Sequence, residues 1–285
     1  LKRYMKRYTL ILLAILAVSC GGAGNQNVNQ NQAVEVNIDT SAASIDSEND
    51  NKVLESLPAS HEIIALLVDH PDAMFDATIL NSETLAPKYN TSMSRSLNLG
   101  VYGVDMSYAS LFNQNQTVIK YMAVVKIMAE QLGVLKFFDD ATMQKMEQNM
   151  DNKEMMIDII SNAFYDSDKY LLENGQHEIA AMIISGAWIE AMYTAFNLTK
   201  GKYRLNPPLS SRILKQCKSI DLMINFLSEY KDGGVGEINA DFLAIQDLIN
   251  QANITIKDDL YFCSDNAFKS IRDKIAEIRA RYVAL

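Results

Sequence analysis

The chain has 285 residues, 48% of them hydrophobic and 21% charged, a balance that is typical of globular proteins and excludes an intrinsically disordered chain. The formal net charge is −9, and residues 1–19 hold four cations and no acids, so the remainder stands at −13. A surface this acidic repels phosphate groups, which excludes nucleic acid as a partner.

The first twenty residues have the order of a secretory signal peptide. Four cations within the first seven residues precede an apolar run from Thr9 to Val18, and Ser19-Cys20 follows it. This ending resembles the lipobox of bacterial lipoproteins, in which the cysteine thiol is acylated and the chain is cut before it. The apolar run is too short to cross a hydrocarbon layer of about 30 Å as a lasting helix. We therefore expect residues 1–19 to be a lipoprotein signal peptide and Cys20 to be the lipidation site.

Residues 20–52 have the composition of a flexible tether. Seven of the eight residues from Asn25 to Gln32 are Asn or Gln, and small and acidic residues follow. Such a segment buries too little apolar surface to offset the entropy of ordering it. A flexible segment of this length reaches about 30 Å, which would hold the folded part near the membrane but not on it. The folded domain is then residues 53–285.

Apolar residues recur at helical spacing through that domain. The pattern predicts helices over 60–70, 72–80, 92–112, 117–132, 140–150, 152–173, 176–197, 208–230 and 237–252, and from residue 264 onward. Several of these segments end at glycine, as helices commonly do. A strand is suggested at most over 253–256. The sequence thus predicts an all-α fold, a single bundle of about eight or nine helices with no internal linker.

Segment 176–197 differs from its neighbours because apolar residues surround it almost completely. Only a thin line of Gly186, Glu190 and Thr194 breaks the apolar surface. A helix that is apolar nearly all round is a buried centre, and we expect this one to be the core of the bundle. Gly100 and Gly103 in segment 92–112 would let a neighbouring backbone approach closely. The last segment has an apolar seam for docking on the bundle: Phe268, Ile271, Ile275, Ile278 and Tyr282.

Asp105 and Glu190 are carboxylates within otherwise apolar helices. A carboxylate that is removed from water without partners is costly, so hydroxyl groups or a cation should satisfy both acids. Two interpretations stay open. The acids form either a polar knot that fixes the register of the helices, in which two phenols bind Asp105, or a ligand pocket. The residues that would bind a ligand are Tyr102, Asp105, Tyr108, Trp188, Glu190 and Tyr193.

Other patterns favour structural interpretations. His70-Pro71-Asp72 spells the tripeptide of J-domain co-chaperones, but the helix before it lacks their cations. The methionine cluster of residues 143–156 could bind Cu(I) through thioethers, yet methionine also fills irregular cores. Asp166 and Asp168 form an Asp-x-Asp pattern within a helical segment, which indicates a solvated helix face. No Glu-x-x-His pair for a di-iron centre is present.

Cys217 and Cys263 are the cysteines that remain besides Cys20. In an exported protein they could form a disulfide, but each lies in an apolar helical context that suits a free buried thiol. The sequence carries no recognised catalytic, cofactor or metal motif, and we expect no catalytic residue, no cofactor and no metal site.

One family resemblance rests on three stretches, namely Leu97 to Tyr108, Asp151-Asn152-Lys153 and Gly186 to Tyr193, with Leu132-Gly133 between them. The chain after about residue 57 resembles a group of uncharacterised helical lipoproteins of Gram-negative envelopes. The resemblance implies a helical fold and an envelope location, and it implies no activity. Gly21 after the lipidated cysteine favours the outer membrane, where we expect the periplasmic face, with the cell surface as the alternative.

These observations lead to three functional hypotheses. The first is a non-catalytic lipoprotein, held on the membrane by its acylated cysteine, that binds a protein or another envelope component. It predicts a contiguous exposed apolar patch. The second is a small-ligand binder with an enclosed pocket near Asp105 and Glu190. The third is an unfamiliar enzyme with acids that converge in an open cleft.

Overall fold

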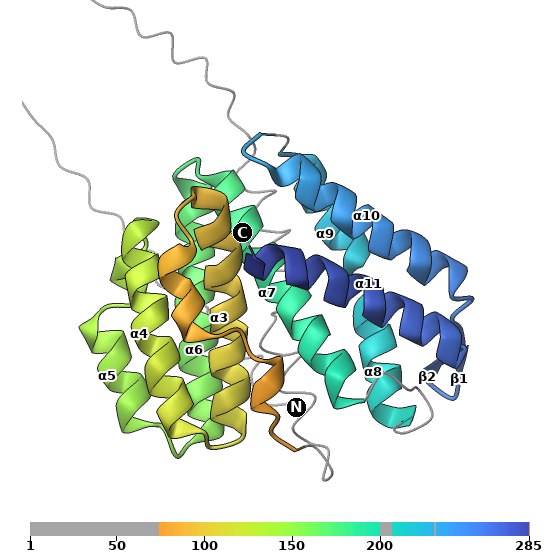
Figure 1. Cartoon of the computed structure of the whole chain (residues 1–285), viewed down its shortest axis with the longest axis horizontal. Helices are drawn as coiled ribbons and strands as arrows, with labels where there is room; N and C mark the ends of the chain where they lie inside the picture. The colour runs from red at the N-terminus through yellow and green to blue at the C-terminus, as the bar shows by residue number, and fades with distance from the viewer. Residues whose placement is uncertain (1–73, 200–206, 231, 285) are drawn as a thin grey trace, which may run out of the picture. The chain divides into compact units, whose positions relative to one another are not determined.

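The computed structural model describes residues 74–199, 207–230 and 232–284 (Figure 1). Five predictions lie outside these residues: the signal peptide, the lipidation of Cys20, the tether, the helix over 60–70 and the role of His70-Pro71-Asp72. Within the described ranges the chain runs helix after helix, so the predicted all-α bundle is confirmed. The α-helices there are α3 (Ser92–Leu111), α4 (Asn115–Gln131), α5 (Asp140–Gln148), α6 (Lys153–Glu173), α7 (His177–Leu198), α8 (Pro207–Cys217), α9 (Ile220–Ser228), α10 (Val235–Gln251) and α11 (Asp265–Ala284).

Local sequence signals explain where several of these helices begin and end. The side chain of Thr91 accepts a hydrogen bond from the backbone N–H of Ser94, and the Ser94 hydroxyl accepts one from Thr91, which forms a capping box at the start of α3. Asn152 caps α6 in a similar way through its side-chain oxygen. Gly133 and Gly175 follow α4 and α6 in the left-handed conformation, with φ of 76° and 70°.

The segment 208–230 differs from its prediction because it forms two helices, α8 and α9. The break lies at Ser219, whose hydroxyl donates to the carbonyl of Gln216 at 2.7 Å. A serine that binds a nearby carbonyl competes with the helical backbone pattern. The same hydroxyl accepts a bond of 3.4 Å from the indole N–H of Trp188 on α7. Tertiary contact thus reinforces a break that helical periodicity does not reveal.

Two short regions also differ from their predictions. The described part of the segment 72–80, residues 74–80, holds the 3₁₀ turn η1 (Ala77–Ile79) and not the predicted α-helix. The longer 3₁₀ helix η2 (Glu83–Lys88) follows and was not predicted. The strand suggested near 253–256 is β1 (Thr255–Lys257), which pairs antiparallel with an unpredicted strand β2 (Leu260–Phe262). The turn between the strands holds Asp258 and Asp259, both with positive φ, as a two-residue hairpin requires.

Helix α7 is the core helix, as its apolar circumference predicts. It packs against α3, α6, α8, α9, α10 and α11. In the described part of the chain it is the one helix long and apolar enough to cross a bilayer, and 83% of its most apolar window is buried inside the fold. Burial by other helices is the environment that a core helix of a globular domain requires.

Helices α3 and α7 cross at two glycines, one from each helix. A Cβ atom on Gly100 would lie 2.1 Å from the carbonyl oxygen of Ile183, and one on Gly186 would lie 2.0 Å from the carbonyl oxygen of Leu97. The two backbones therefore touch where neither residue has a side chain. The prediction for Gly100 is confirmed, whereas Gly103 faces the ring of Phe164 and not a backbone.

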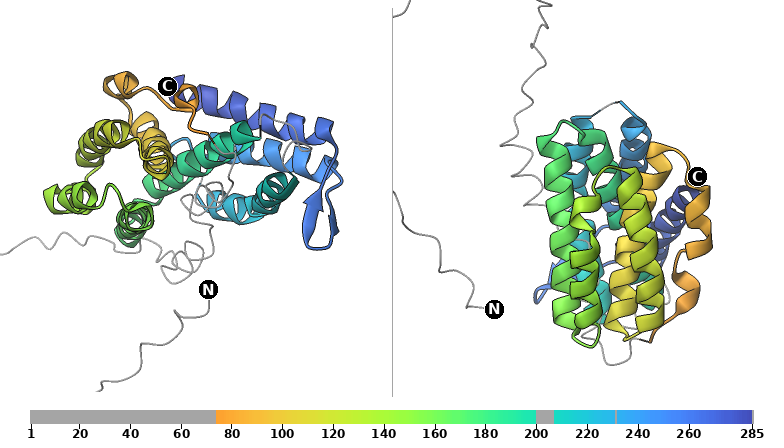
Figure 2. Two further views of the ribbon diagram at one scale, coloured as in Figure 1. Left: turned by 90° about the horizontal axis from the view of Figure 1, so that it is seen from below. Right: turned by 90° about the vertical axis from the view of Figure 1, so that its left-hand side faces the viewer.

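Helix α11 docks through its predicted seam. Its five seam residues are all buried: Phe268, Ile271, Ile275, Ile278 and Tyr282. The helix packs against α7, α10 and α3, and Figures 1 and 2 show it alongside α10 with the hairpin at one end of the pair. The docking brings two arginines of α11, Arg279 and Arg281, to acids of other helices.

Candidate functional site

A buried acid–arginine cluster joins three helices. It consists of Asp105 from α3, Glu190 from α7 and Arg279 from α11. Arg279 binds Glu190 through two nitrogen atoms of its guanidinium. Nε donates to Oε2 at 2.8 Å and Nη2 donates to Oε1 at 2.9 Å. The Glu190 side chain is fully buried and that of Arg279 is 12% exposed. This paired, planar geometry is the strongest form of an arginine–carboxylate interaction.

Asp105 is the third member of the cluster. Its Oδ2 accepts a bond of 2.8 Å from the backbone N–H of Asn81, and its Oδ1 has no donor among the described residues. Burial, together with the nearby carboxylate of Glu190, raises the pKa of Asp105 well above its ordinary value. The raised pKa favours the protonated form of Asp105 beside the carboxylate of Glu190. With Asp105 in this form, the Arg279–Glu190 ion pair balances the charge of the cluster.

The segment before α3 forms a cover over the cluster. Arg279 Nη2 also donates to the carbonyl of Ile79 at 3.3 Å. The hydroxyl of Tyr121 donates to the carbonyl of Asn81 at 2.9 Å, and that of Tyr102 donates to the carbonyl of Ser82 at 2.7 Å. Irregular backbone that is buried needs partners for its polar groups, and these side chains supply them.

Two buried asparagines connect this cover to the end of α11. The side-chain amide of Asn81 donates to Tyr89 Oη at 3.1 Å and to Asn98 Oδ1 at 3.2 Å. Asn98 in turn donates to the carbonyl of Tyr282 at 2.9 Å, and the hydroxyl of Tyr89 donates to the carbonyl of Val283 at 2.9 Å. Most polar groups around the cluster thus have partners within the fold, so the arrangement suits a fixed structural element.

The structure brings together four of the six residues predicted as ligand-binding. Tyr102, Asp105 and Glu190 lie in or beside the cluster, and the ring of Tyr193 lies 4.7 Å below the guanidinium of Arg279 in a cation–π contact. Trp188 lies apart, against Phe242 on α10, with ring centroids 5.2 Å apart.

The expectation that two phenols bind Asp105 is wrong. Tyr102 donates to the carbonyl of Ser82. Tyr108 accepts a bond of 3.0 Å from the backbone N–H of Asp76. Both phenols are used instead to hold the chain before α3, because that irregular segment has backbone groups that need side-chain partners.

Sequence reasoning missed Arg279 and Asn81. It required a cation or hydroxyl partner for a buried Glu190 but could not choose it, since 89 residues separate Glu190 from Arg279. The one available signal was the position of Arg279 directly after Ile278 of the apolar seam, where a cation has to find a partner in the core or bend toward solvent. No sequence pattern could have predicted the role of Asn81, because it donates to Asp105 through its backbone N–H group, which every residue except proline has.

The structure also places two other predicted features, the methionine cluster and the Asp166/Asp168 pattern. The methionine cluster is mainly core, because Met143, Met146 and Met156 are buried among apolar residues. The expected solvated face is wrong for Asp168, which is buried with its Oδ1 unpaired among the described residues, and burial raises its pKa well above the ordinary value. Asp166 is exposed.

Both remaining cysteines are free thiols. Cys217 is buried and Cys263 half-buried. Burial raises the pKa of the Cys263 thiol to about 11, and it raises that of Cys217 further. Thiols with raised pKa values are poor nucleophiles, so neither has the environment of a reactive cysteine.

Comparison with known proteins gave no match to a family model, a curated protein or a solved structure.

Proposed function

We propose that this protein is a non-catalytic binding module of a bacterial cell envelope, held by acylated Cys20 to the periplasmic face of the outer membrane. Its partner is a protein that offers an apolar helix face. The sequence pattern of residues 1–20 supports the membrane anchor, and Gly21 after the cysteine supports the outer membrane. The observation that carries the binding role is an exposed apolar row on α4.

The apolar row consists of Ile119, Ala123 and Ile127, which follow one another at intervals of four residues. Ile119 is 44% exposed and Ile127 is 55% exposed, and Ala123 between them is exposed as well. Single exposed apolar residues are common on protein surfaces, but three in a row form a continuous ridge. A ridge of this spacing fits the groove on another helix.

The rest of α4 indicates that the ridge is not needed for the fold. Its opposite side is buried against the core through Val118, Tyr121 and Val125. The nearby lysines are engaged locally, because Lys120 pairs with Glu83 at 3.1 Å and Lys126 pairs with Asp140. The ridge is therefore flanked by neutralised charge, which lowers the cost of covering it with an apolar partner.

The buried acid–arginine cluster supports the binding module over a ligand pocket near Asp105 and Glu190. Both acids are fully buried. Glu190 is held by Arg279, and the Asp105 carboxyl is bound by Asn81. A ligand would have to displace contacts that already stabilise the fold.

A photo-crosslinking experiment in the envelope tests the proposal. A photoreactive amino acid would replace Ile127 on the ridge or, as the matched control, Leu243 on α10, which is 42% exposed. We expect one defined polypeptide adduct from the Ile127 position and none from Leu243. Equal labelling at both positions, or none at either, would contradict the assignment of α4.

The membrane anchor is tested separately by mass spectrometry of the full chain after gentle extraction from membranes. We expect the mass of an acylated cysteine at the start of the mature chain, and its loss in Cys20→Ser together with release from the membrane. A stoichiometric small-molecule adduct that disappears in Glu190→Gln would instead favour the ligand-binding alternative.

A further inference from the structure

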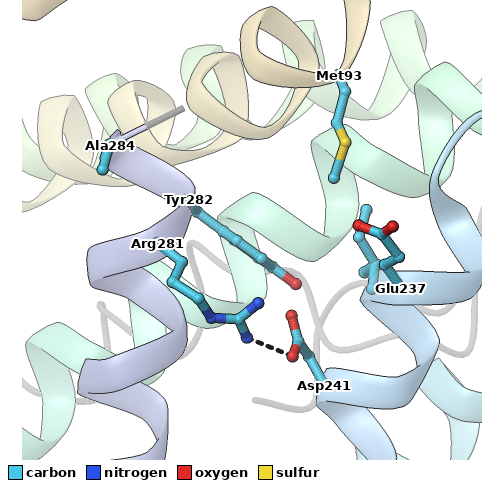
Figure 3. A pocket seen from close by; sticks show the side chains of 7 residues that line it. Met93, Glu237, Asp241, Arg281, Tyr282 and Ala284 are labelled. Atoms are coloured by element: carbon cyan, nitrogen blue, oxygen red, sulfur yellow. Dashed lines mark hydrogen bonds and ion pairs between the residues drawn. The ribbon is translucent and has the colours of Figure 1, made fainter.

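A pocket lies where the ends of three helices, α3, α10 and α11, meet. We name it the α10–α11 pocket. It has a volume of about 260 Å³ and is lined by Met93 from α3, Glu237, Ile238 and Asp241 from α10, and Arg281, Tyr282 and Ala284 from α11. Figure 3 shows the acidic and phenolic side chains turned toward the same space. This volume is slightly below the range of about 300–1,000 Å³ that is typical of ligand pockets, so it suits only a small ligand.

The hydroxyl of Tyr282 is the unusual group in this pocket. The residue is only 2% exposed, and its hydroxyl has no hydrogen-bond partner among the described residues. Figure 3 shows the hydroxyl pointing toward the carboxylate of Asp241, but no hydrogen bond joins them. A buried hydroxyl without a partner destabilises a fold, so a bound group that pairs with it would be favoured.

The charges around this hydroxyl favour a cation. Arg281 Nη2 donates to Oδ1 of Asp241, which leaves Oδ2 as an acceptor. Glu237 is exposed and makes no ion pair among the described residues. Two carboxylates and one guanidinium give the lining a net charge of −1. An anion would have to approach both carboxylates to reach an arginine that is already paired, so the electrostatics oppose it.

The geometry also distinguishes a metal ion from an organic cation. No group of three or more His, Cys, Asp or Glu side chains suited to a metal is present in the described ranges, whereas Ca²⁺ takes six to eight oxygen ligands. An ammonium group has three N–H donors. The pocket offers three acceptors for them: a Glu237 carboxylate oxygen, Asp241 Oδ2 and the Tyr282 hydroxyl. Met93 and Ile238 add apolar atoms beside these groups.

We propose that the α10–α11 pocket binds a small molecule that carries a primary ammonium group on a short apolar chain. The ammonium group lies between Glu237, Asp241 and Tyr282, and the carbon chain contacts Met93 and Ile238. This site is independent of the proposed binding role of α4, because no residue is shared between the two surfaces.

The test is a calorimetric titration of the full chain with n-pentylammonium chloride. Two probes with the same carbon chain, n-pentanol and pentanoate, separate the charge from the apolar contact. We expect saturable binding of the ammonium probe, at least tenfold weaker binding of n-pentanol and none of pentanoate. Equal binding of the alcohol would overturn the ammonium assignment, and so would the absence of saturable ammonium binding.

Three variants locate the site. Tyr282→Phe removes only the hydroxyl, and we expect it to weaken ammonium binding at least threefold while the melting temperature stays level or rises. Glu237→Gln should weaken binding at least tenfold. Glu277→Gln is the matched control, because Glu277 lies on the exposed side of α11 and pairs with Lys274, and it should leave binding unchanged. Binding that is unaffected by Tyr282→Phe and Glu237→Gln would place the probe elsewhere and overturn the proposal.

Discussion

Two arginines on α11 stand two residues apart, and each binds a carboxylate of another helix. The Arg279–Glu190 pair is 12% and 0% exposed, whereas the Arg281–Asp241 pair is 54% and 16% exposed. Arg279 binds both carboxylate oxygens of Glu190, and Asp105, whose raised pKa favours the protonated form, lies beside the pair. Arg281 binds only one carboxylate oxygen of Asp241, which lines a pocket. The same two residue types therefore form a buried contact that holds three helices together in one place and a partly exposed pair at the edge of a pocket in the other, and the difference is burial.

Replacing each arginine in turn should give the largest difference in stability between the two pairs. Arg279→Met leaves Glu190 as a buried, unpaired charge, and we expect a loss of about 3–5 kcal/mol in the free energy of unfolding. Arg281→Met removes a pair whose arginine is 54% exposed and whose acid can still reach water through the pocket, and it should cost less, about 1 kcal/mol. Urea unfolding followed by circular dichroism measures both. Similar losses in the two variants would mean that burial does not distinguish the pairs.

Amide substitutions test which acid in the buried cluster carries the charge. Glu190→Gln removes the charge that Arg279 needs, and we expect a loss of about 3 kcal/mol or more. Asp105→Asn replaces a carboxyl group whose raised pKa favours the neutral form with a neutral amide, whose oxygen can still accept the hydrogen bond from Asn81. It should cost about 1 kcal/mol or less. A larger loss for Asp105→Asn than for Glu190→Gln in urea unfolding would reverse the assignment.

The contact between α3 and α7 decides whether the buried cluster can assemble. In Gly186→Ala the new methyl group would meet the carbonyl of Leu97, so the helices have to separate, and we expect a loss of about 1–3 kcal/mol. Gly103→Ala on α3 is the comparison, since its methyl group would meet the ring of Phe164, a side chain, and not a backbone. Thermal unfolding should rank Gly186→Ala as the less stable variant. The opposite order would contradict a backbone contact.

The pH dependence of stability separates the neutral acid from the charged pairs. The pKa of Asp105 is raised in the folded protein, so between its unfolded value of about 4 and the raised value the folded state binds more protons than the unfolded state. Its contribution is fully present below about pH 4 and falls as the pH rises through that window, by at most about 1.4 kcal/mol per pH unit. Asp105→Asn should lose this slope.

Asp168 has a raised pKa of the same direction, so the comparison uses the difference between the wild type and Asp105→Asn at each pH. Urea unfolding from pH 4 to pH 8 measures it. Parallel stability curves for the two proteins would show that Asp105 is ionised in the fold and would contradict the protonated assignment.

The sequence by itself determined most of the helices and the centre of the bundle. The apolar circumference of segment 176–197 predicted α7 as the core helix, and the seam of the last segment predicted the buried face of α11, because periodicity reports directly which side of a helix avoids water. It also predicted that the buried acids need partners, since an unpaired buried charge is unfavourable whatever the fold.

Only the tertiary structure decided which partners those acids have. Arg279 is 89 residues from Glu190, and Asn81 reaches Asp105 through a backbone N–H group that has no sequence signature. The tertiary structure also decided three other features, namely the break between α8 and α9, the burial of Asp168 and the α10–α11 pocket. Each depends on contacts between segments that are distant along the chain, whereas periodicity describes one segment at a time.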